Sequence, residues 1–297
     1  MKDGILCINK PAGFTSFDVI GKLRGILKFK RLGHSGTLDP MATGVLPVFV
    51  GKATKCCDIL PNDDKCYIAG FKFGATTDTQ DSTGTITHTF EPKKVTIEDI
   101  QSVLKDYIGE ILQVPPMYSA VSINGQRLYD LARKNIVVER PPRKIVVYSI
   151  RVLSYGADTL SGTLEISCGK GTYVRTLIND IGDALGVGGY MTSLVRTSAS
   201  GFDLKDCYSF EDVTNAMLDS SIDSLIVPTE TIFKDYPKLS LSEVQTKQYR
   251  NGVKLPILEL NVSTEYSTYA VYSFDGVFIG TANVDPTEGI LRVGKNF

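Results

Sequence analysis

The chain has 297 residues, of which 42% are hydrophobic and 22% are charged, and its formal net charge is −1. These values are typical of a folded globular protein, and the length favours two domains. A net charge near zero excludes a protein that is basic over its whole surface. Because no apolar run reaches the roughly 18 residues of a membrane-spanning helix, we expect a cytoplasmic protein without a membrane partner.

The cysteines and histidines argue against a metal site. The six cysteines are scattered and include no C-x-x-C pair, and the chain has only two histidines. This pattern fits buried thiols in a reducing compartment better than a disulfide framework or a zinc knuckle.

Charge is unevenly distributed along the chain. Residues 1–57 contain nine Lys or Arg and three acidic residues, and residues 126–151 contain seven Lys or Arg and two acidic residues. Residues 202–235 contain eight acidic residues and two lysines. This asymmetry favours a basic face for a polyanion, although solvated helix faces would give the same count.

The first predicted helix is "SFDVIGKLRGILKF", in which apolar residues recur at helical spacing. Ser16 is the expected N-cap, and the exposed side carries Lys22, Arg24 and Lys28. The next segment, "GHSGTLDPMATG", has three glycines and a proline but no hydrophobic periodicity, so we expect a shaped loop that presents Asp39.

Strands and two further helices are predicted downstream. "GVLPVFVG", "CYIAGFKFG" and "TGTITHTFEP" have the pattern of strands, and "IVVYSIRVLSYG" and "LSGTLEISCG" that of a strand pair. "TIEDIQSVLKDYIGEIL" predicts a helix with Thr96 and Asp99 in capping-box spacing, and "TYVRTLINDIGDALG" predicts another. The result is a mixed α/β domain.

Two segments stand outside this domain. Residues 113–144 combine a Pro-rich entry, an Asn-Gly turn at 124–125 and a short basic helix, which indicates an excursion from the core. Pro228 and Pro237 bracket an expected linker, and the strand runs and Asp-Gly turn that follow predict a β module of about sixty residues.

Asp39 could be a nucleophile, a general base or a metal ligand. Asp78 and Asp81 are more typical of turn formers than of partners in a metal site. A nucleophilic carboxylate in a closed pocket requires a cation, which typically lowers its pKa by about 1 to 3 units. Arg175, in the first turn of a helix after a Gly-Lys-Gly turn, is the candidate; an ordinary surface arginine is the alternative.

Two further residues have an ordinary and a functional interpretation. Tyr67 fits a core aromatic of a strand, but it could also offer a ring on which a base stacks. His34 fits a loop hydrogen-bonder or a catalyst.

Five motifs occur in an order that we recognise. They are "NKPAGFTSFDV", "GHSGTLDPMATGVLPV", "KCYIAGFKFGATTDTQDSTG", "VPPMYSAVSINGQRLYDLAR" and "CGKGTYVRTLINDIG". The chain resembles the TruB family of tRNA pseudouridine synthases from end to end. The resemblance implies an α+β catalytic domain, mixed α/β on a mostly antiparallel sheet with flanking helices, at residues 1–236. It also implies a thumb-like RNA-binding insertion at about 113–145 and a PUA-like RNA-binding barrel at 237–297.

The resemblance also implies an activity. The family isomerises uridine 55 in the T loop of tRNA to pseudouridine after flipping the base out of the stack, without a cofactor or metal. The expected partner is the T-arm stem-loop of tRNA, and the expected state is a monomer without an obligate protein partner. Whether the aspartate attacks C6 of the ring or C1′ of the sugar stays open.

The family's residue roles carry over by motif. The catalytic aspartate falls on Asp39, its arginine partner on Arg175, and the aromatic beneath the base on Tyr67, which is also a proposed base. The expected RNA-site residues are His34, which fills space in the RNA, Lys10, which with Pro11 supports the loop, Leu194, which lines the pocket, and Arg127 and Lys170.

Three other readings are weighed against this one. An RNA-binding module without catalysis would share the basic segments but gives no reason for Asp39, Tyr67 and Arg175 to occur together. A synthase directed by guide RNA and a metal-dependent hydrolase are the remaining alternatives.

Overall fold

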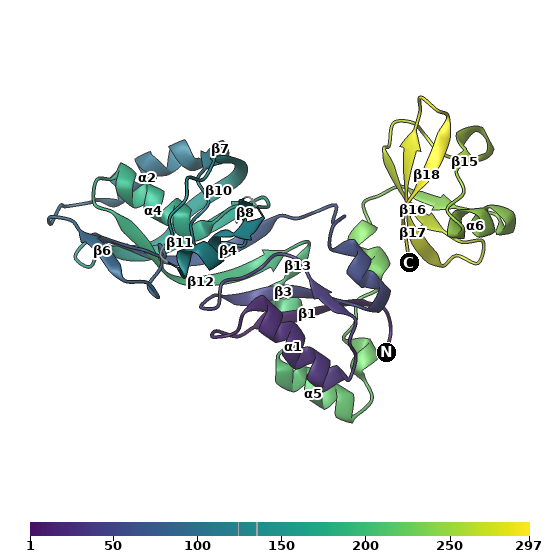
Figure 1. Ribbon diagram of the computed structural model, residues 1–297, viewed down its shortest axis with the longest axis horizontal. Helices are drawn as coiled ribbons and strands as arrows, with labels where there is room; N and C mark the ends of the chain where they lie inside the picture. The colour runs from purple at the N-terminus through teal and green to yellow at the C-terminus, as the bar shows by residue number, and fades with distance from the viewer. Residues whose placement is uncertain (124, 135) are drawn as a thin grey trace.

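The computed structural model describes residues 1–123, 125–134 and 136–297. Its centre is a long twisted sheet (Figure 1). The main path runs β1 (Gly4–Lys10), β3 (Thr43–Val50), β12 (Gly189–Ala199), β4 (Lys65–Phe73), β11 (Ser161–Cys168), β10 (Arg143–Gly156) and β7 (Gly109–Gln113). β2 (Leu32–His34) pairs with β3, and β13 (Phe202–Asp203) pairs with β12. Only the β3–β12 pair in this sheet of the described residues is parallel, which confirms the mostly antiparallel sheet.

Helices flank the sheet at both ends, as expected. α1 (Ser16–Leu27) and α5 (Phe210–Leu218) pack on β1 and β3, and α2 (Ile97–Leu104) and α4 (Val174–Ala184) pack on β4, β10 and β11. Each pair buries its apolar stripe against alternate residues of the strands beneath it. The two helix pairs are separated along the sheet, which leaves the middle of the sheet open between α1 and α4 (Figure 1).

The start of α1 differs from the prediction by one residue. Thr15, not Ser16, is the N-cap: its hydroxyl accepts from the Asp18 amide, and the Asp18 carboxylate accepts from the Thr15 amide. The prediction of Ser16 was wrong because both residues are good caps and the sequence does not choose between them. The Ser16 hydroxyl is therefore available for a tertiary contact.

The helix predicted over 96–112 is shorter than expected. Its capping box of Thr96 and Asp99 is confirmed, but α2 ends at Leu104 and a short 3-10 turn, η2 (Lys105–Tyr107), follows. Gly109 has a φ of 99° and opens strand β7, which pairs with β10. The last apolar residues fit a helix or a strand equally, and the sheet edge offered by β10 decided between them.

The other predicted elements of this domain are confirmed. "GVLPVFVG" and "CYIAGFKFG" form β3 and β4, the predicted strand pair forms β10 and β11, and α4 contains Arg175 in its first turn. "TGTITHTFEP" contributes β6 (Ile86–Thr89), which pairs with β5 (Ala75–Thr77). The remaining 3-10 turns of the domain are η1 (Gly51–Cys56), η3 (Leu204–Asp206) and η4 (Ile222–Ser224).

The segment 113–144 leaves the sheet after β7 and returns to it at β10. It contains the two-stranded β8 (Ser122–Ile123) and β9 (Gln126–Arg127) and the short helix α3 (Leu128–Ala132). Asn124 of the predicted Asn-Gly turn lies outside the described residues, whereas Gly125 has a φ of 79°. Leu128 is buried, so the excursion has an apolar anchor of its own.

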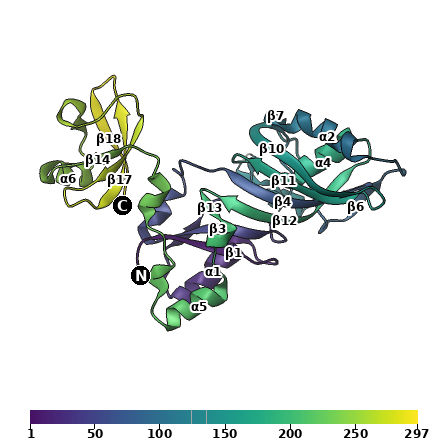
Figure 2. The same ribbon diagram turned by 180° about the vertical axis from the view of Figure 1, so that it is seen from behind.

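The chain ends in a separate β module (Figure 2). Its five-stranded curled sheet has the order β14 (Lys238–Ser240), β16 (Thr268–Tyr272), β17 (Phe278–Asp285), β18 (Ile290–Asn296) and β15 (Leu255–Pro256). α6 (Glu243–Arg250) and η6 (Ile257–Glu259) complete it around a core that includes Leu239, Tyr249 and Ile279. The small β-rich module expected from the sequence is thus confirmed.

The segment between Pro228 and Pro237 is not a free linker. It contains the turn η5 (Thr229–Phe233), and Phe233 is almost fully buried. The Phe233 ring lies 5.6 Å from Phe278 of the module, and Phe278 lies 5.6 Å from Phe297. The two prolines do bound the segment, but the packing of Phe233 against these rings orders it, so the prediction of a linker was wrong. Within the described part of the chain, no helix is both long and apolar enough to span a membrane.

Candidate active site

The Asp39 loop joins β2 to β3, and hydrogen bonds to Ser16 of α1 hold it in place. Leu38 is buried, and its amide donates to the Ser16 hydroxyl at 2.9 Å, which in turn donates to the Leu38 carbonyl at 3.3 Å. Gly36 has a φ of 69°, a left-handed conformation that favours glycine. The loop is therefore a fixed support for Asp39 rather than a free connection, as predicted from its glycines and Pro40.

Lys10 is a second support for the loop. Its side chain is fully buried at the end of β1, and its Nζ donates to the carbonyls of Pro11, Phe14 and Pro40 at 3.0, 2.6 and 3.2 Å. Burial lowers the pKa of Lys10 to about 8, although Asp39 opposes this change. Lys10 therefore has no exposed surface to offer RNA in this structure, and its contacts are those of a loop support.

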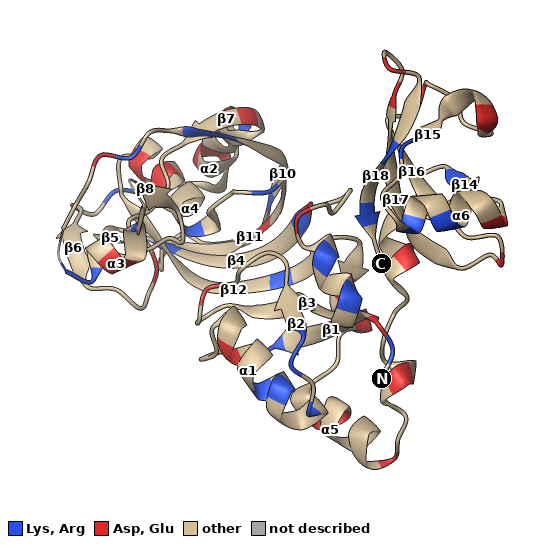
Figure 3. Ribbon diagram, turned by 45° about the vertical axis from the view of Figure 1, so that its right-hand side comes forward, with Lys and Arg blue, Asp and Glu red and all other residues tan. Residues whose placement is uncertain are grey.

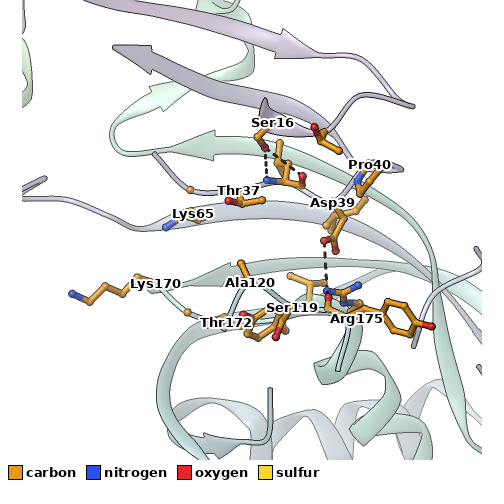
Figure 4. A pocket seen from close by; sticks show the side chains of 18 of the residues that line it. Ser16, Thr37, Asp39, Pro40, Lys65, Ser119, Ala120, Lys170, Thr172 and Arg175 are labelled. Carbon is orange, nitrogen blue, oxygen red and sulfur yellow. Dashed lines mark hydrogen bonds and ion pairs between the residues drawn. The ribbon is translucent and has the colours of Figure 1, made fainter. Parts of the chain in front are cut away.

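Arg175 faces Asp39 across the open middle of the sheet (Figure 4). Its Nη2 lies 3.5 Å from Asp39 Oδ1 and donates to the Tyr118 carbonyl at 2.6 Å. The arginine comes from the first turn of α4 and is almost fully buried. Two segments more than 130 residues apart in the sequence thus place a carboxylate against a guanidinium, as the sequence predicted.

Asp81 is a site residue that we missed in the sequence. One of its carboxylate oxygens accepts from the Thr79 hydroxyl and from the amide and hydroxyl of Thr83, which is the turn-forming role we expected. Its other oxygen, Oδ2, lies 3.7 Å from Arg175 Nη1. Arg175 therefore lies between two carboxylates, and a turn motif alone gave no signal of this second contact.

The pKa of Asp39 is raised above its ordinary value. Burial is the largest cause and Asp81 adds to it, while Arg175 and Lys10 oppose the rise. Our expectation that Arg175 would hold this pKa below the usual range was therefore wrong for the net direction. Desolvation of the carboxylate outweighs an arginine that is 3.5 Å away and shared with Asp81.

Asp39, Arg175 and Tyr67 line one cavity of about 780 Å³. Tyr67 lies on β4 with 6% of its surface exposed, and burial raises the pKa of its phenol to about 12. Leu194, on the neighbouring strand β12, lines the same cavity and is buried. The cavity thus has a charged pair at one side and an aromatic and an apolar side chain on its floor, a composition that suits a planar base.

The remaining predicted residues lie around the cavity rim. His34, Arg127 and Lys170 all line it, and the last two are exposed. His34 is partly buried, and burial lowers the pKa of its imidazole. Figure 4 shows Lys170 at the edge of the pocket, on the turn that leads into α4. The excursion therefore brings at least one cation, Arg127, to the cavity that holds Asp39.

The described residues contain no group of three or more His, Cys, Asp or Glu arranged to hold a metal ion. The chemistry that the pocket offers is that of an ionisable carboxylate, an arginine that stabilises its charge, and a tyrosine hydroxyl. This set can perform nucleophilic or electrostatic catalysis on a flat ring that enters the cavity.

Two family models match the chain. The model described as "TruB family pseudouridylate synthase (N terminal domain)" covers residues 24–174, and the one described as "tRNA pseudouridylate synthase B C-terminal domain" covers residues 175–234. Among curated proteins, tRNA pseudouridine synthase B of Dehalococcoides mccartyi is 42% identical over 295 residues, which is 99% of this chain and 96% of that protein. The protein of the same name from Clostridium kluyveri is 43% identical over 283 residues, covering 94% of both chains.

Solved structures match over the same length. A chain in the crystal structure of a Cbf5-Nop10-Gar1 complex superimposes with a TM-score of 0.76 at 25% identity, covering 99% of this chain and 84% of that chain. A chain in an H/ACA RNP bound to a substrate RNA containing 2'-deoxyuridine gives a TM-score of 0.74 at 23% identity, covering 99% and 84%. The shared fold thus includes the C-terminal module, consistent with a PUA-like half-barrel.

Proposed function

The chain belongs to the TruB family of pseudouridylate synthases, and on this premise we propose that it converts uridine 55 in the T loop of tRNA to pseudouridine. The observation that carries the proposal is the pairing of Asp39 with Arg175 in a cavity floored by Tyr67. The curated relatives are named tRNA pseudouridine synthase B, which supports tRNA as the substrate.

The reaction moves the uracil from N1 to C5. The bond between C1′ and N1 breaks, the base turns, a bond forms between C1′ and C5, and the hydrogen of C5 leaves as a proton while N1 gains one. Asp39 acts in its ionised form as nucleophile or electrostatic stabiliser, and attack on C6 or on C1′ both require that form. Arg175 stabilises the carboxylate charge, and Tyr67, which lines the same cavity, supports the ring and serves as the base that takes the proton of C5.

The target base must leave its stack before it can enter the cavity. Flipping costs a few kcal/mol of stacking and pairing, which RNA contacts elsewhere must offset. We assign this part to Arg127 and Lys170 at the rim and to the 113–145 insertion, with His34 filling the space that the uridine vacates and Leu194 lining the pocket. RNA loops are recognised through shape, stacking and phosphate contacts, which suits a basic rim beside an apolar floor.

We further propose a division into a catalytic domain at 1–236 and a PUA-like RNA-binding domain at 237–297. The separate apolar core of the module supports this boundary. We also propose that the chain acts as a monomer in the cytoplasm, without cofactor, metal or guide RNA. Activity of the purified chain on tRNA alone, in the presence of EDTA, tests whether a cofactor, a metal or a guide RNA is required, and its mass in solution tests the monomer.

The deciding experiment is tritium release from a T-arm stem-loop labelled at C5 of its uridines. We expect the wild type to release one tritium per RNA and Asp39→Ala to release none while binding the RNA with similar affinity. Sequencing the product RNA for pseudouridine then identifies position 55. Tight binding without release by the wild type would instead favour an RNA-binding protein that shares the fold.

A further inference from the structure

One row of residues crosses four neighbouring strands beneath the Asp39 loop. Lys10 of β1 is paired with Gly44 of β3, Gly44 with Arg196 of β12, and Arg196 with Tyr67 of β4. Residues paired directly across strands point to the same face of a sheet. The loop support Lys10 and the cavity tyrosine Tyr67 are therefore members of one row, and Arg196 is between them.

Arg196 is fully buried, with no exposed surface at all. Its Nε donates to the Val45 carbonyl at 2.7 Å, and its Nη2 donates to the Gly36 carbonyl at 2.9 Å. Its Nη1 is buried and makes no hydrogen bond with the described residues. No carboxylate of the described residues forms an ion pair with Arg196, in contrast to Arg175.

The glycines of the loop are fitted to this arginine. A Cβ added at Gly36 would lie 3.2 Å from Arg196 Nη1, and a Cβ added at Gly44 would lie 2.2 Å from the Arg196 carbonyl oxygen. Gly36 therefore packs against the guanidinium of Arg196, and Gly44 packs against its backbone. Two glycines of the segment that presents Asp39 thus leave room for Arg196.

Burying Arg196 without an ion-pair partner costs folding free energy. An isolated buried cation loses its hydration, and well-packed apolar residues often stabilise a fold as much as a buried ion pair does. The two carbonyls satisfy part of the guanidinium but do not neutralise it. A positive charge retained at this position is therefore best explained by the groups beside it.

Charged and titratable groups near Tyr67 shift the pKa of its phenol in opposite directions. Burial raises the pKa of Tyr67 and Arg196 opposes this rise, whereas Asp39 and Cys168 add to it. Arg196 also lowers the pKa values of His34 and Lys10. Among these neighbours, Arg196 is the cation that acts on the phenol of Tyr67.

We propose that Arg196 is a positioning residue of the reaction: its Nη2 fixes the Gly36 carbonyl within the Asp39 loop, and its Nη1 edge orients the hydroxyl of Tyr67 toward the uridine. A donor on the tyrosine oxygen leaves the hydroxyl hydrogen and the remaining lone pair directed into the cavity. This role rests on the proposed function, because it concerns the same pocket and the same reaction.

A double-mutant cycle tests the proposal. Arg196→Gln, Tyr67→Phe and the double variant are compared with the wild type in single-turnover tritium release at saturating enzyme, alongside the Kd for the stem-loop. We expect Arg196→Gln to slow the reaction about 100-fold with less than about a threefold change in Kd, and to cost much less in the Tyr67→Phe background. Equal slowing in both backgrounds would overturn the link to Tyr67.

Further variants separate charge, structure and function. Arg196→Lys keeps the positive charge but not the planar guanidinium, and we expect it to react about tenfold faster than Arg196→Gln. If Arg196→Gln does not fold, the cycle is run with Arg196→Lys under the same criterion. Arg151→Gln, which replaces an exposed arginine paired with Glu165, is the control and is expected to react like the wild type. An inactive wild type would contradict the proposed function itself, whatever the variants do.

A measurement on the free protein does not depend on activity. In protein labelled with 3-fluorotyrosine, whose phenol ionises at lower pH than tyrosine, the fluorine resonance of residue 67 is assigned by its loss in Tyr67→Phe. We expect Arg196→Gln to move its titration midpoint to higher pH, because the cation that favours the phenolate is gone. An unchanged midpoint would show that Arg196 does not act on Tyr67.

Discussion

At the scale of single residues, Asp39 carries a conflict between stability and catalysis. Burial raises its pKa, so its ionised form is less favourable in the folded protein than in the unfolded chain. The proposed reaction requires that form. Arg175 and Lys10 offset part of this cost, because both cations favour the ionised carboxylate.

Asp39→Asn should therefore abolish turnover and raise thermal stability at neutral pH. A carboxyl whose folded pKa is above its unfolded value loses stability as pH rises through these two values, so above both of them its charge is a net cost. Replacing it with an uncharged side chain removes that cost, as is common at active sites. Calorimetry at pH 7 checks the sign, with Asp158→Asn as an exposed control; a lower Tm for Asp39→Asn would contradict the argument.

The pH dependence of the reaction follows from the same shift. Activity should fall on the acid side at a pH above the ordinary aspartate value of about 3.9, because Asp39 takes up its proton earlier. Asp81→Asn should move this acid limb to lower pH, since Asp81 raises the pKa of Asp39. It should also slow the reaction about tenfold or more, because Arg175 loses one of its two carboxylates. A limb at the same pH would exclude Asp81 as a cause.

At the scale of elements, the site depends on how α1 supports the loop. Ser16 uses its hydroxyl to hold both backbone groups of Leu38, one residue before Asp39. The capping of the helix is left to Thr15. One helix terminus thus has two functions, divided between adjacent residues.

Ser16→Ala tests this support. It leaves the Leu38 amide and carbonyl without their partner, which should cost about 1–3 kcal/mol of unfolding free energy and slow turnover about tenfold or more. Thr96→Ala, which removes the cap of the remote helix α2, should cost about 1 kcal/mol and leave turnover unchanged. Denaturant titration and tritium release on both variants check the difference; equal turnover would remove Ser16 from the loop's support.

At the scale of the whole molecule, the C-terminal module is tied to the catalytic domain by aromatic packing. The ring of Phe278 stacks against both Phe233 and Phe297, and the three rings form one cluster. Deleting the module would remove Phe278 and Phe297 and expose Phe233, so a truncated chain could lose stability as well as RNA contacts. Charge reversal on the module's surface separates the two. Figure 3 shows Lys and Arg on α6 and β18.

Lys247→Glu with Arg250→Glu should weaken binding of full tRNA more than binding of the isolated T-arm stem-loop. The module is expected to contact RNA beyond the T arm, and each lost phosphate contact reduces the salt dependence of binding by about one unit of slope. Filter binding of both RNAs at several salt concentrations measures this. Lys205→Glu, in the acidic segment, is the control, and an equal loss for both RNAs would contradict the placement of the module.

The amino-acid sequence was sufficient to predict the elements whose signals are local and to propose which residues take part in the reaction. Local patterns correctly predicted the capping box of α2, the helix α4 and the strands β3, β4, β10 and β11. The sequence also predicts the contact between Asp39 and Arg175, because a buried carboxylate needs a cation and because the two motifs occur together in one family.

Where contacts with distant segments outweigh local preference, the sequence was not sufficient and the folded arrangement was needed. The end of the predicted helix at 109–112 became strand β7 because β10 offered hydrogen bonds. Burial reversed the expected direction of the Asp39 pKa. Asp81 reaches Arg175 because a loop faces the first turn of α4. Arg196 lies beside Tyr67 because the two are paired across neighbouring strands. Such contacts depend on distances in space, which spacing along a chain does not encode.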